Sequence, residues 1–122
     1  SLKAQVSGGL LQGMSQARFE NWAFDLRWGV NQNNRLHTAK PITMMNAPPE
    51  FQFAAVDIPD RENPVGSRGI GEPPVGAGAA VVLSAIQDAI GMPITRTPVS
   101  SDKILNALEG GATGYTTLQT HV

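Results

Sequence analysis

Apolar residues recur with helical spacing near the start of the chain. In the stretch GGLLQGMSQARFE (8–20), one face carries Leu10, Met14 and Ala17. Residues three and four apart share one face of an α-helix, so this pattern predicts an amphipathic helix. Gly8 and Gly9 lie at its entrance, where another group can approach the backbone closely.

Two further helices are predicted in the second half of the chain. Between residues 74 and 90 the apolar face consists of Val75, Ala79, Val82, Leu83, Ile86 and Ile90. Gly76 and Gly78 lie inside this helix, and each costs about 1 kcal/mol relative to alanine, which indicates close packing there. Gly91 is placed to end the helix. The stretch SSDKILNALEGG (100–111) predicts a last helix, capped by Ser100 or Ser101 and closed by Gly110.

Three segments favour β-strands. In residues 22–28, the large apolar side chains of Trp22, Phe24, Leu26 and Trp28 alternate with smaller or charged ones, as in a half-buried strand. Residues 36–43 and the stretch EFQFAAVDI (50–58) are further candidates. Together the elements predict an α+β fold, a small mixed or antiparallel sheet with two or three helices packed on it. Both tryptophans are expected to be core residues, with an interface role as the alternative.

The composition argues against several classes of partner and site. The net charge of −1 and nine scattered Lys and Arg residues argue against a nucleic-acid partner. The absence of cysteine excludes disulfides and thiolate-bound metal or iron–sulfur sites on this chain. No apolar run approaches the roughly 20 residues of a membrane span. These features do not assign a compartment, so the cytoplasm and the periplasm both stay open.

The 122 residues fit one domain, which we expect to occupy residues 1–111 and to be followed by a flexible polar tail at 112–122. The chain begins at Ser1 rather than Met. We therefore expect a processed or excised segment.

Glu72 stands out in VGSRGIGEPPVGAGAA (65–80) as one carboxylate among glycines and prolines. The simplest interpretation is a solvated acid that interacts with a helix N-terminus. The alternative is a general base, because Pro73 and Pro74 would hold the carboxylate rigidly and partial desolvation improves a carboxylate for that role. Phosphate binding by this loop is disfavoured, since the glycines match neither nucleotide-binding motif and a carboxylate would repel phosphate.

Other polar residues give weaker indications. Gln5 precedes Gly8 and Gly9, where its amide could donate to and accept from a polar ligand. His37 and His121 are too isolated for a metal site and are expected to be surface or structural residues, so no metal ligand is predicted.

Three stretches, AQVSGGLLQGMSQA, GSRGIGEPPVGAGAAVVLSAIQDAIG and ITRTPVSSDKILNAL, resemble the C-terminal part of the molybdopterin-binding large subunit of the molybdenum hydroxylases, the xanthine dehydrogenase and aldehyde oxidase family. The resemblance covers about residues 4–108, and the Gly-x-Gly-Glu-Pro-Pro motif is its most specific part. The segment NAPPEF is similar to bacterial aldehyde or isoquinoline oxidoreductase subunits.

The resemblance implies roles for particular residues. Glu72 would be the catalytic base beside the metal, and Gln5 would contact the pterin cofactor. The remaining residues implied to bind the cofactor are Gly8, Gly9, Ser67, Gly69 and Gly71.

The implied cofactor is molybdenum–molybdopterin, bound in the full assembly and not by this chain alone. The implied partners are the rest of the molybdopterin-binding subunit, an iron–sulfur subunit or domain and, as a further candidate, a flavin subunit. On this interpretation the chain belongs to an aldehyde or N-heterocycle oxidoreductase and is inactive by itself. The alternative is a non-catalytic structural or interaction domain that retains the fold.

Overall fold

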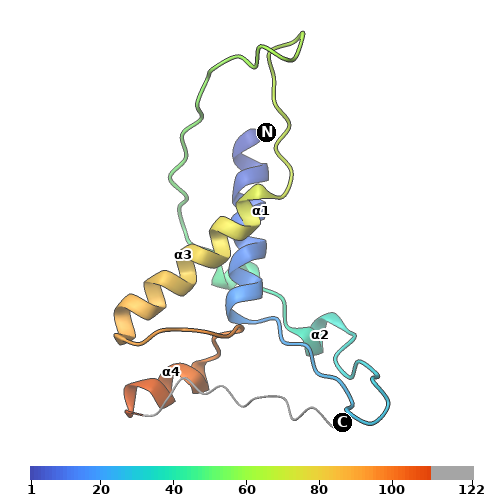
Figure 1. Cartoon of the computed structure of the whole chain (residues 1–122), viewed down its shortest axis with the longest axis vertical. Coiled ribbons are helices and arrows are strands. Elements are labelled where there is room, and N and C mark those ends of the chain that lie inside the picture. The colour runs from blue at the N-terminus through green and yellow to red at the C-terminus, as the bar shows by residue number, and fades with distance from the viewer. Residues whose placement is uncertain (111–122) are drawn as a thin grey trace.

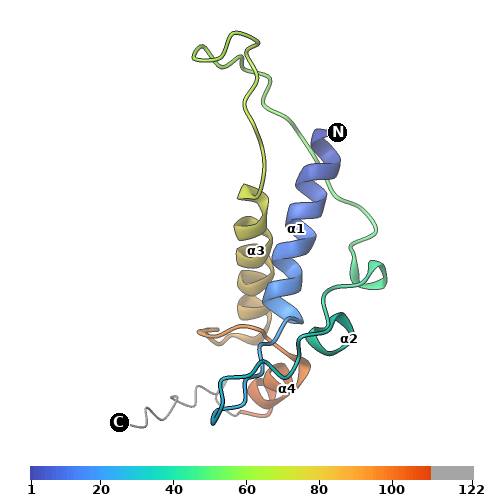
Figure 2. The same ribbon diagram turned by 90° about the vertical axis from the view of Figure 1, so that its right-hand side faces the viewer.

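The computed structural model describes residues 1–110, so the predicted flexible tail at 112–122 lies outside the described residues. The elements are α1 (Leu2–Arg18), α2 (Leu36–Ala39), the 3-10 helix η1 (Met44–Asn46), α3 (Pro73–Ile90) and α4 (Ser101–Leu108). Helices α1 and α3 lie side by side, and the segment between η1 and α3 extends beyond the N-terminal end of α1 (Figures 1 and 2).

The α1–α3 contact depends on residues without a β-carbon. A Cβ placed on Gly13 would lie 2.6 Å from the backbone nitrogen of Ala79, and closer still to the Val75 carbonyl oxygen. On the other helix, a Cβ on Gly78 would lie 2.9 Å from the Cα of Leu10. The two backbones therefore touch where they cross, as predicted from the glycine at position 78.

The three predicted helices are confirmed, with shifted boundaries. Helix α1 begins before the predicted stretch because the Ser1 hydroxyl accepts a hydrogen bond from the Ala4 backbone N–H. The six apolar residues of the predicted α3 face are all partly buried. Gly91 ends α3 with a φ of 67°, and Ser100 occupies the N-cap position of α4, although its side chain makes no capping hydrogen bond. Gly76, in contrast to Gly78, would place its Cβ in open space.

The segment before α4 is joined to the end of α1. The backbone N–H of Val99 donates to the Ala17 carbonyl at 2.7 Å, and Arg18 Nη1 donates to the Val99 carbonyl at 2.8 Å. Apart from Pro74 and the glycines of the α1–α3 contact, the buried apolar residues of the described chain are Val99, Ala17 and Ala107. The core of these 110 residues is consequently small and lies near the C-terminal end of α1.

The predicted α+β fold is wrong, because residues 1–110 contain no sheet. The one β-type pairing in this region is an isolated bridge between Phe24 and Asn31. Residues 22–28 instead lead into a turn at 26–28, where Asp25 Oδ1 accepts from the backbone N–H groups of Arg27 and Trp28. Alternation predicts an extended segment with one apolar and one polar face. A β-strand also needs a neighbouring segment that pairs with it by backbone hydrogen bonds, and residues 22–28 have only the isolated bridge.

The tryptophans and the other predicted strands also differ from expectation. Trp22 and Trp28 are each 71% exposed, so their assignment to the core is wrong within the described chain. Residues 36–43 contain α2 in place of a strand, and residues 50–58 run without regular secondary structure.

The segment from residue 47 to residue 72 forms a long arm with an organised tip (Figure 2). Asp60 donates its backbone N–H to the Gly66 carbonyl at 2.8 Å, and Gly66 has a φ of 67°. Arg68 Nε forms an ion pair with Asp60 Oδ2 at 2.9 Å. The tip of the arm therefore has its own network of hydrogen bonds.

Helix α3 is long and apolar enough, by length and composition alone, to cross a membrane, and no other helix in residues 1–110 meets that criterion. The sequence-based expectation that no stretch approaches this length therefore does not hold for α3. Core helices of soluble proteins meet the same criterion, so the finding by itself assigns no membrane contact.

Candidate functional site

The start of α3 presents Glu72 on a rigid backbone. Glu72 is the N-cap residue, with φ −95° and ψ −2°, and Pro73 follows as the first helical residue. Proline suits this position because its φ is already helical and it has no N–H to satisfy. Pro74 is buried, which fixes the first turn against α1.

The Glu72 side chain is exposed and makes no capping hydrogen bond. An exposed carboxylate at the N-cap is compatible with the simplest interpretation from the sequence, a solvated acid that interacts with the helix N-terminus. The backbone of Glu72 is thus fixed at the start of α3, while its carboxylate oxygen atoms remain available to another group.

Gln5 reaches the same place from α1. Its Nε2 donates a hydrogen bond of 2.8 Å to the carbonyl oxygen of Gly71, the residue before Glu72. These two residues are 66 positions apart in the sequence. The structure thus brings together the two polar residues singled out from the sequence, and the bond that joins them was not predicted.

The four glycines that the resemblance implied to bind the cofactor differ in their surroundings. Gly8, Gly69 and Gly71 are exposed, and a Cβ on any of them would meet no atom within 4 Å. Gly9 is buried, and its Cβ would lie 2.8 Å from the Cβ of Pro74. Within this chain Gly9 serves the contact between α1 and α3, whereas the other three leave open space near Glu72 and along α1.

Ser67 lies in the network at the arm tip. Its carbonyl oxygen accepts a hydrogen bond of 2.7 Å from Asn63 Nδ2. Arg68 beside it, together with the backbone N–H of Glu62, lowers the pKa of Asp60 below its ordinary value of 3.8. Ser67 is not joined to Gln5 or Gly71 by a hydrogen bond in the described chain, so its assignment to the cofactor site stays a prediction.

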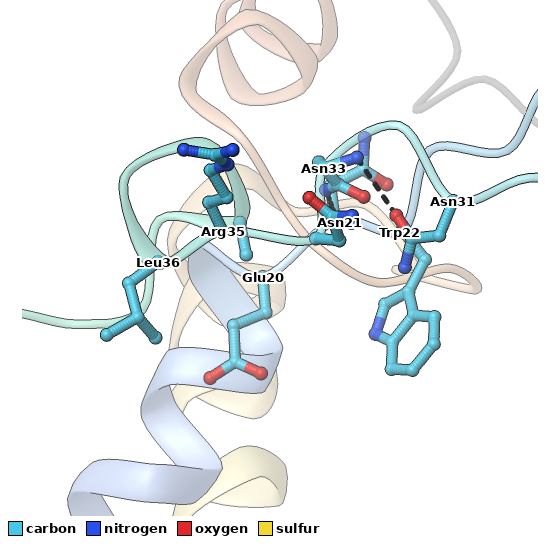
Figure 3. A pocket seen from close by; sticks show the side chains of 9 residues that line it. Glu20, Asn21, Trp22, Asn31, Asn33, Arg35 and Leu36 are labelled. Atoms are coloured by element: carbon cyan, nitrogen blue, oxygen red, sulfur yellow. Dashed lines mark hydrogen bonds between the residues drawn. The ribbon is translucent and has the colours of Figure 1, made fainter.

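A separate pocket of about 240 Å³ lies at the other end of α1 (Figure 3). Asn33 organises it: its Oδ1 accepts from the Ala23 backbone N–H at 2.9 Å, and its Nδ2 donates to the Asn21 carbonyl. Figure 3 shows Trp22 and Glu20 around the same hollow. Asn33 thus holds the loop between residues 21 and 33 in shape.

Residues 1–110 contain no group of three or more His, Cys, Asp or Glu side chains that could hold a metal ion. His37 is exposed, in agreement with the expected surface position, and His121 lies outside the described residues.

Comparison with known proteins finds similar sequences among oxidoreductases. The chain is 31% identical over 102 residues to a xanthine dehydrogenase molybdenum-binding subunit of Escherichia coli O157:H7, a match that covers 84% of this chain and 13% of that protein. It is 30% identical over 105 residues to the aldehyde oxidoreductase of Megalodesulfovibrio gigas, covering 86% of this chain and 11% of that protein. No protein-family model matches the chain.

The fold matches that of part of a larger enzyme. The crystal structure of quinoline 2-oxidoreductase from Pseudomonas putida 86 superposes with a TM-score of 0.77 at 21% sequence identity. The match covers 88% of this chain and 14% of that one. The chain therefore spans about an eighth of the length of the relatives it matches, in sequence and in structure alike.

Proposed function

Because the chain belongs to the molybdenum-binding subunits of the xanthine dehydrogenase and aldehyde oxidoreductase family, we propose that it forms one wall of the molybdopterin pocket and supplies Glu72 as the catalytic base. The observation that carries the proposal is the state of Glu72. Its carboxylate sits on a helix start stiffened by two prolines, yet it makes no capping hydrogen bond. A general base needs this combination of fixed position and available oxygen atoms.

The residues around Glu72 fit a large group at this surface. Gly69 and Gly71 precede the carboxylate, and Gly8 and Gly76 leave further backbone open on α1 and α3. Backbone without side chains lets a planar or anionic cofactor approach closely. When bound, the molybdenum cofactor would supply the oxidation–reduction chemistry of substrate hydroxylation. This chain would contribute the proton acceptor and the shape of the wall.

One wall gives too few contacts for a cofactor site, so we infer that the chain acts only in an assembly. Ligand sites are concave and bury most of the ligand, whereas Glu72, Gln5 and Gly71 are all exposed here. The first partner would be the rest of the molybdenum-binding subunit. Because the chain has no cysteine, the electrons would leave through an iron–sulfur subunit or domain, and a flavin subunit is a further candidate.

The apolar surface of the chain supports packing against more protein. Large hydrophobic side chains that are well exposed include Trp22, Leu26, Trp28, Leu36, Met44, Met45 and Val56. A surface with this much exposed apolar area is typical of an interaction site. The same observation favours the second candidate function, a non-catalytic interaction domain that retains the fold.

Substitution of Glu72 distinguishes the two functions. In the complete molybdenum-binding subunit, Glu72→Gln removes the proton acceptor while keeping the size of the side chain. We expect turnover to fall on the order of 10²- to 10⁴-fold, with molybdenum content unchanged, as measured by metal analysis and steady-state kinetics. Glu62→Gln is the matched control, because Glu62 is another exposed carboxylate of the same arm. Wild-type turnover of Glu72→Gln would reject the catalytic role and favour the interaction domain.

A further inference from the structure

We propose that Gln5 is a positioning residue for Glu72, and this inference rests on the proposed function. Its amide holds the peptide group in front of Glu72, so that the carboxylate is oriented from both sides. The resemblance implied only that Gln5 contacts the cofactor. The structure adds a direct bond from Gln5 to the loop that carries the base.

The residue that donates this hydrogen bond, Gln5, is held in place by helix α1. The backbone N–H of Gln5 donates to the Ser1 carbonyl at 3.1 Å, so the residue belongs to the regular first turns of α1. Its side chain then crosses to Gly71, where the Nε2–oxygen distance of 2.8 Å is that of a well-formed hydrogen bond.

The acceptor lies in a segment that has little else to hold it. Gly69 and Gly71 are exposed, and a side chain on either would meet nothing within 4 Å. In the described part of the chain, no backbone–backbone hydrogen bond involves residues 69–71. Glycine also has the widest choice of backbone conformations. Without the amide of Gln5, the peptide group before Glu72 could rotate.

The other side of Glu72 is anchored to the same helix. Pro74 is buried against Gly9, where an added Cβ would come within 2.8 Å of the proline ring. Gln5 and Gly9 are four residues apart and therefore share one face of α1. Helix α1 thus holds the residue before Glu72 by a hydrogen bond and the second residue after it by packing.

The amide can hold the loop and contact a cofactor at the same time. A glutamine side chain has two N–H donors and one carbonyl acceptor, and the bond to Gly71 uses one donor. The two roles predict different defects. Loss of a cofactor contact lowers molybdenum content, whereas loss of positioning lowers the turnover of each molybdenum-loaded enzyme.

The experiment compares three variants in the complete molybdenum-binding subunit. Gln5→Met keeps the length of the side chain and removes the donor. Gln5→Arg restores an N–H donor, because arginine Nε is as many bonds from Cα as glutamine Nε2. Gln12→Met is the matched control, since Gln12 is another exposed glutamine of α1. Gln5 is itself exposed, so none of the changes disturbs buried packing.

We expect Gln5→Met to lower kcat per bound molybdenum roughly 10- to 100-fold, the effect of a small misplacement of a reacting group. KM and molybdenum content should stay near wild type, because positioning acts in the transition state. Hydrogen exchange measured by mass spectrometry should quicken in the peptide that contains Gly71, in the cofactor-free subunit as well. Gln5→Arg should recover most of the lost kcat and exchange protection, and Gln12→Met should change neither.

Two outcomes would overturn the positioning role while Glu72→Gln remains inactive. The first is a Gln5→Met enzyme with wild-type kcat and exchange. The second is a Gln5→Met enzyme that loses molybdenum but has normal turnover per molybdenum, which would assign Gln5 to the cofactor contact alone. An active Glu72→Gln enzyme would instead overturn the proposed function, and the positioning role with it.

Discussion

Alanine at Gly13 tests the contact between α1 and α3. A Cβ on this residue would lie 2.6 Å from the Ala79 backbone nitrogen and closer to the Val75 carbonyl oxygen, whereas real Cβ contacts essentially never fall below 3.0 Å. Both opposing atoms belong to backbone and cannot rotate away, so the helices must separate. Overpacking of this kind costs about 1–3 kcal/mol, and the gain in helix propensity returns about 1 kcal/mol.

Because the clash involves two backbone atoms, we expect an overpacking cost toward the upper end of that range. Gly13→Ala should therefore lower the free energy of unfolding by a net of about 1–2 kcal/mol. Gly8→Ala is the matched control on the same helix, because a Cβ there meets nothing within 4 Å. That variant should instead gain up to about 1 kcal/mol from helix propensity. Urea unfolding followed by far-UV circular dichroism measures both changes.

The two alanine variants should thus shift the unfolding midpoint in opposite directions. If Gly13→Ala were as stable as Gly8→Ala, the close backbone contact between α1 and α3 would not exist in solution. The frame that we propose for Glu72 would then be lost as well, because Pro74 is held by the same pair of helices.

Two further predictions concern other contacts. Ser15→Ala removes a buried hydroxyl that accepts from the Ile42 backbone N–H at 2.8 Å. It should therefore lower the free energy of unfolding by about 1–3 kcal/mol. The control Ser84→Ala changes an exposed serine and should leave the free energy of unfolding nearly unchanged. Arg68→Gln should raise the pKa of Asp60, measured by NMR titration, toward 3.8, because the hydrogen bond from Arg68 is the main cause of its lowered value. Since folding lowers this pKa, the contact stabilises the arm above about pH 3.8 and is lost as the pH falls through the lower folded-state value. An unchanged Asp60 pKa in Arg68→Gln would contradict the ion pair.

Helices α1, α3 and α4 could be predicted because their signals are local. Apolar spacing, the serine before α4 and Gly91 after α3 each act within a few residues. Glu72 was found in the same way, since its glycines and prolines are sequence neighbours. Strands could not be predicted from local signals alone, because a β-strand forms only if another segment pairs with it. Alternation at 22–28 was therefore misleading.

What the sequence determined by itself is the three longer helices α1, α3 and α4, the isolated carboxylate at the head of α3 and the resemblance to molybdenum-binding subunits. Only the tertiary structure decided that Gly9 packs against Pro74, that both tryptophans are exposed, and that Gln5 binds the Gly71 carbonyl. The physical reason is distance along the chain. Contacts between residues dozens of positions apart depend on how two helices cross, and the local pattern indicated only that something packs closely near Gly78, not which residues meet there.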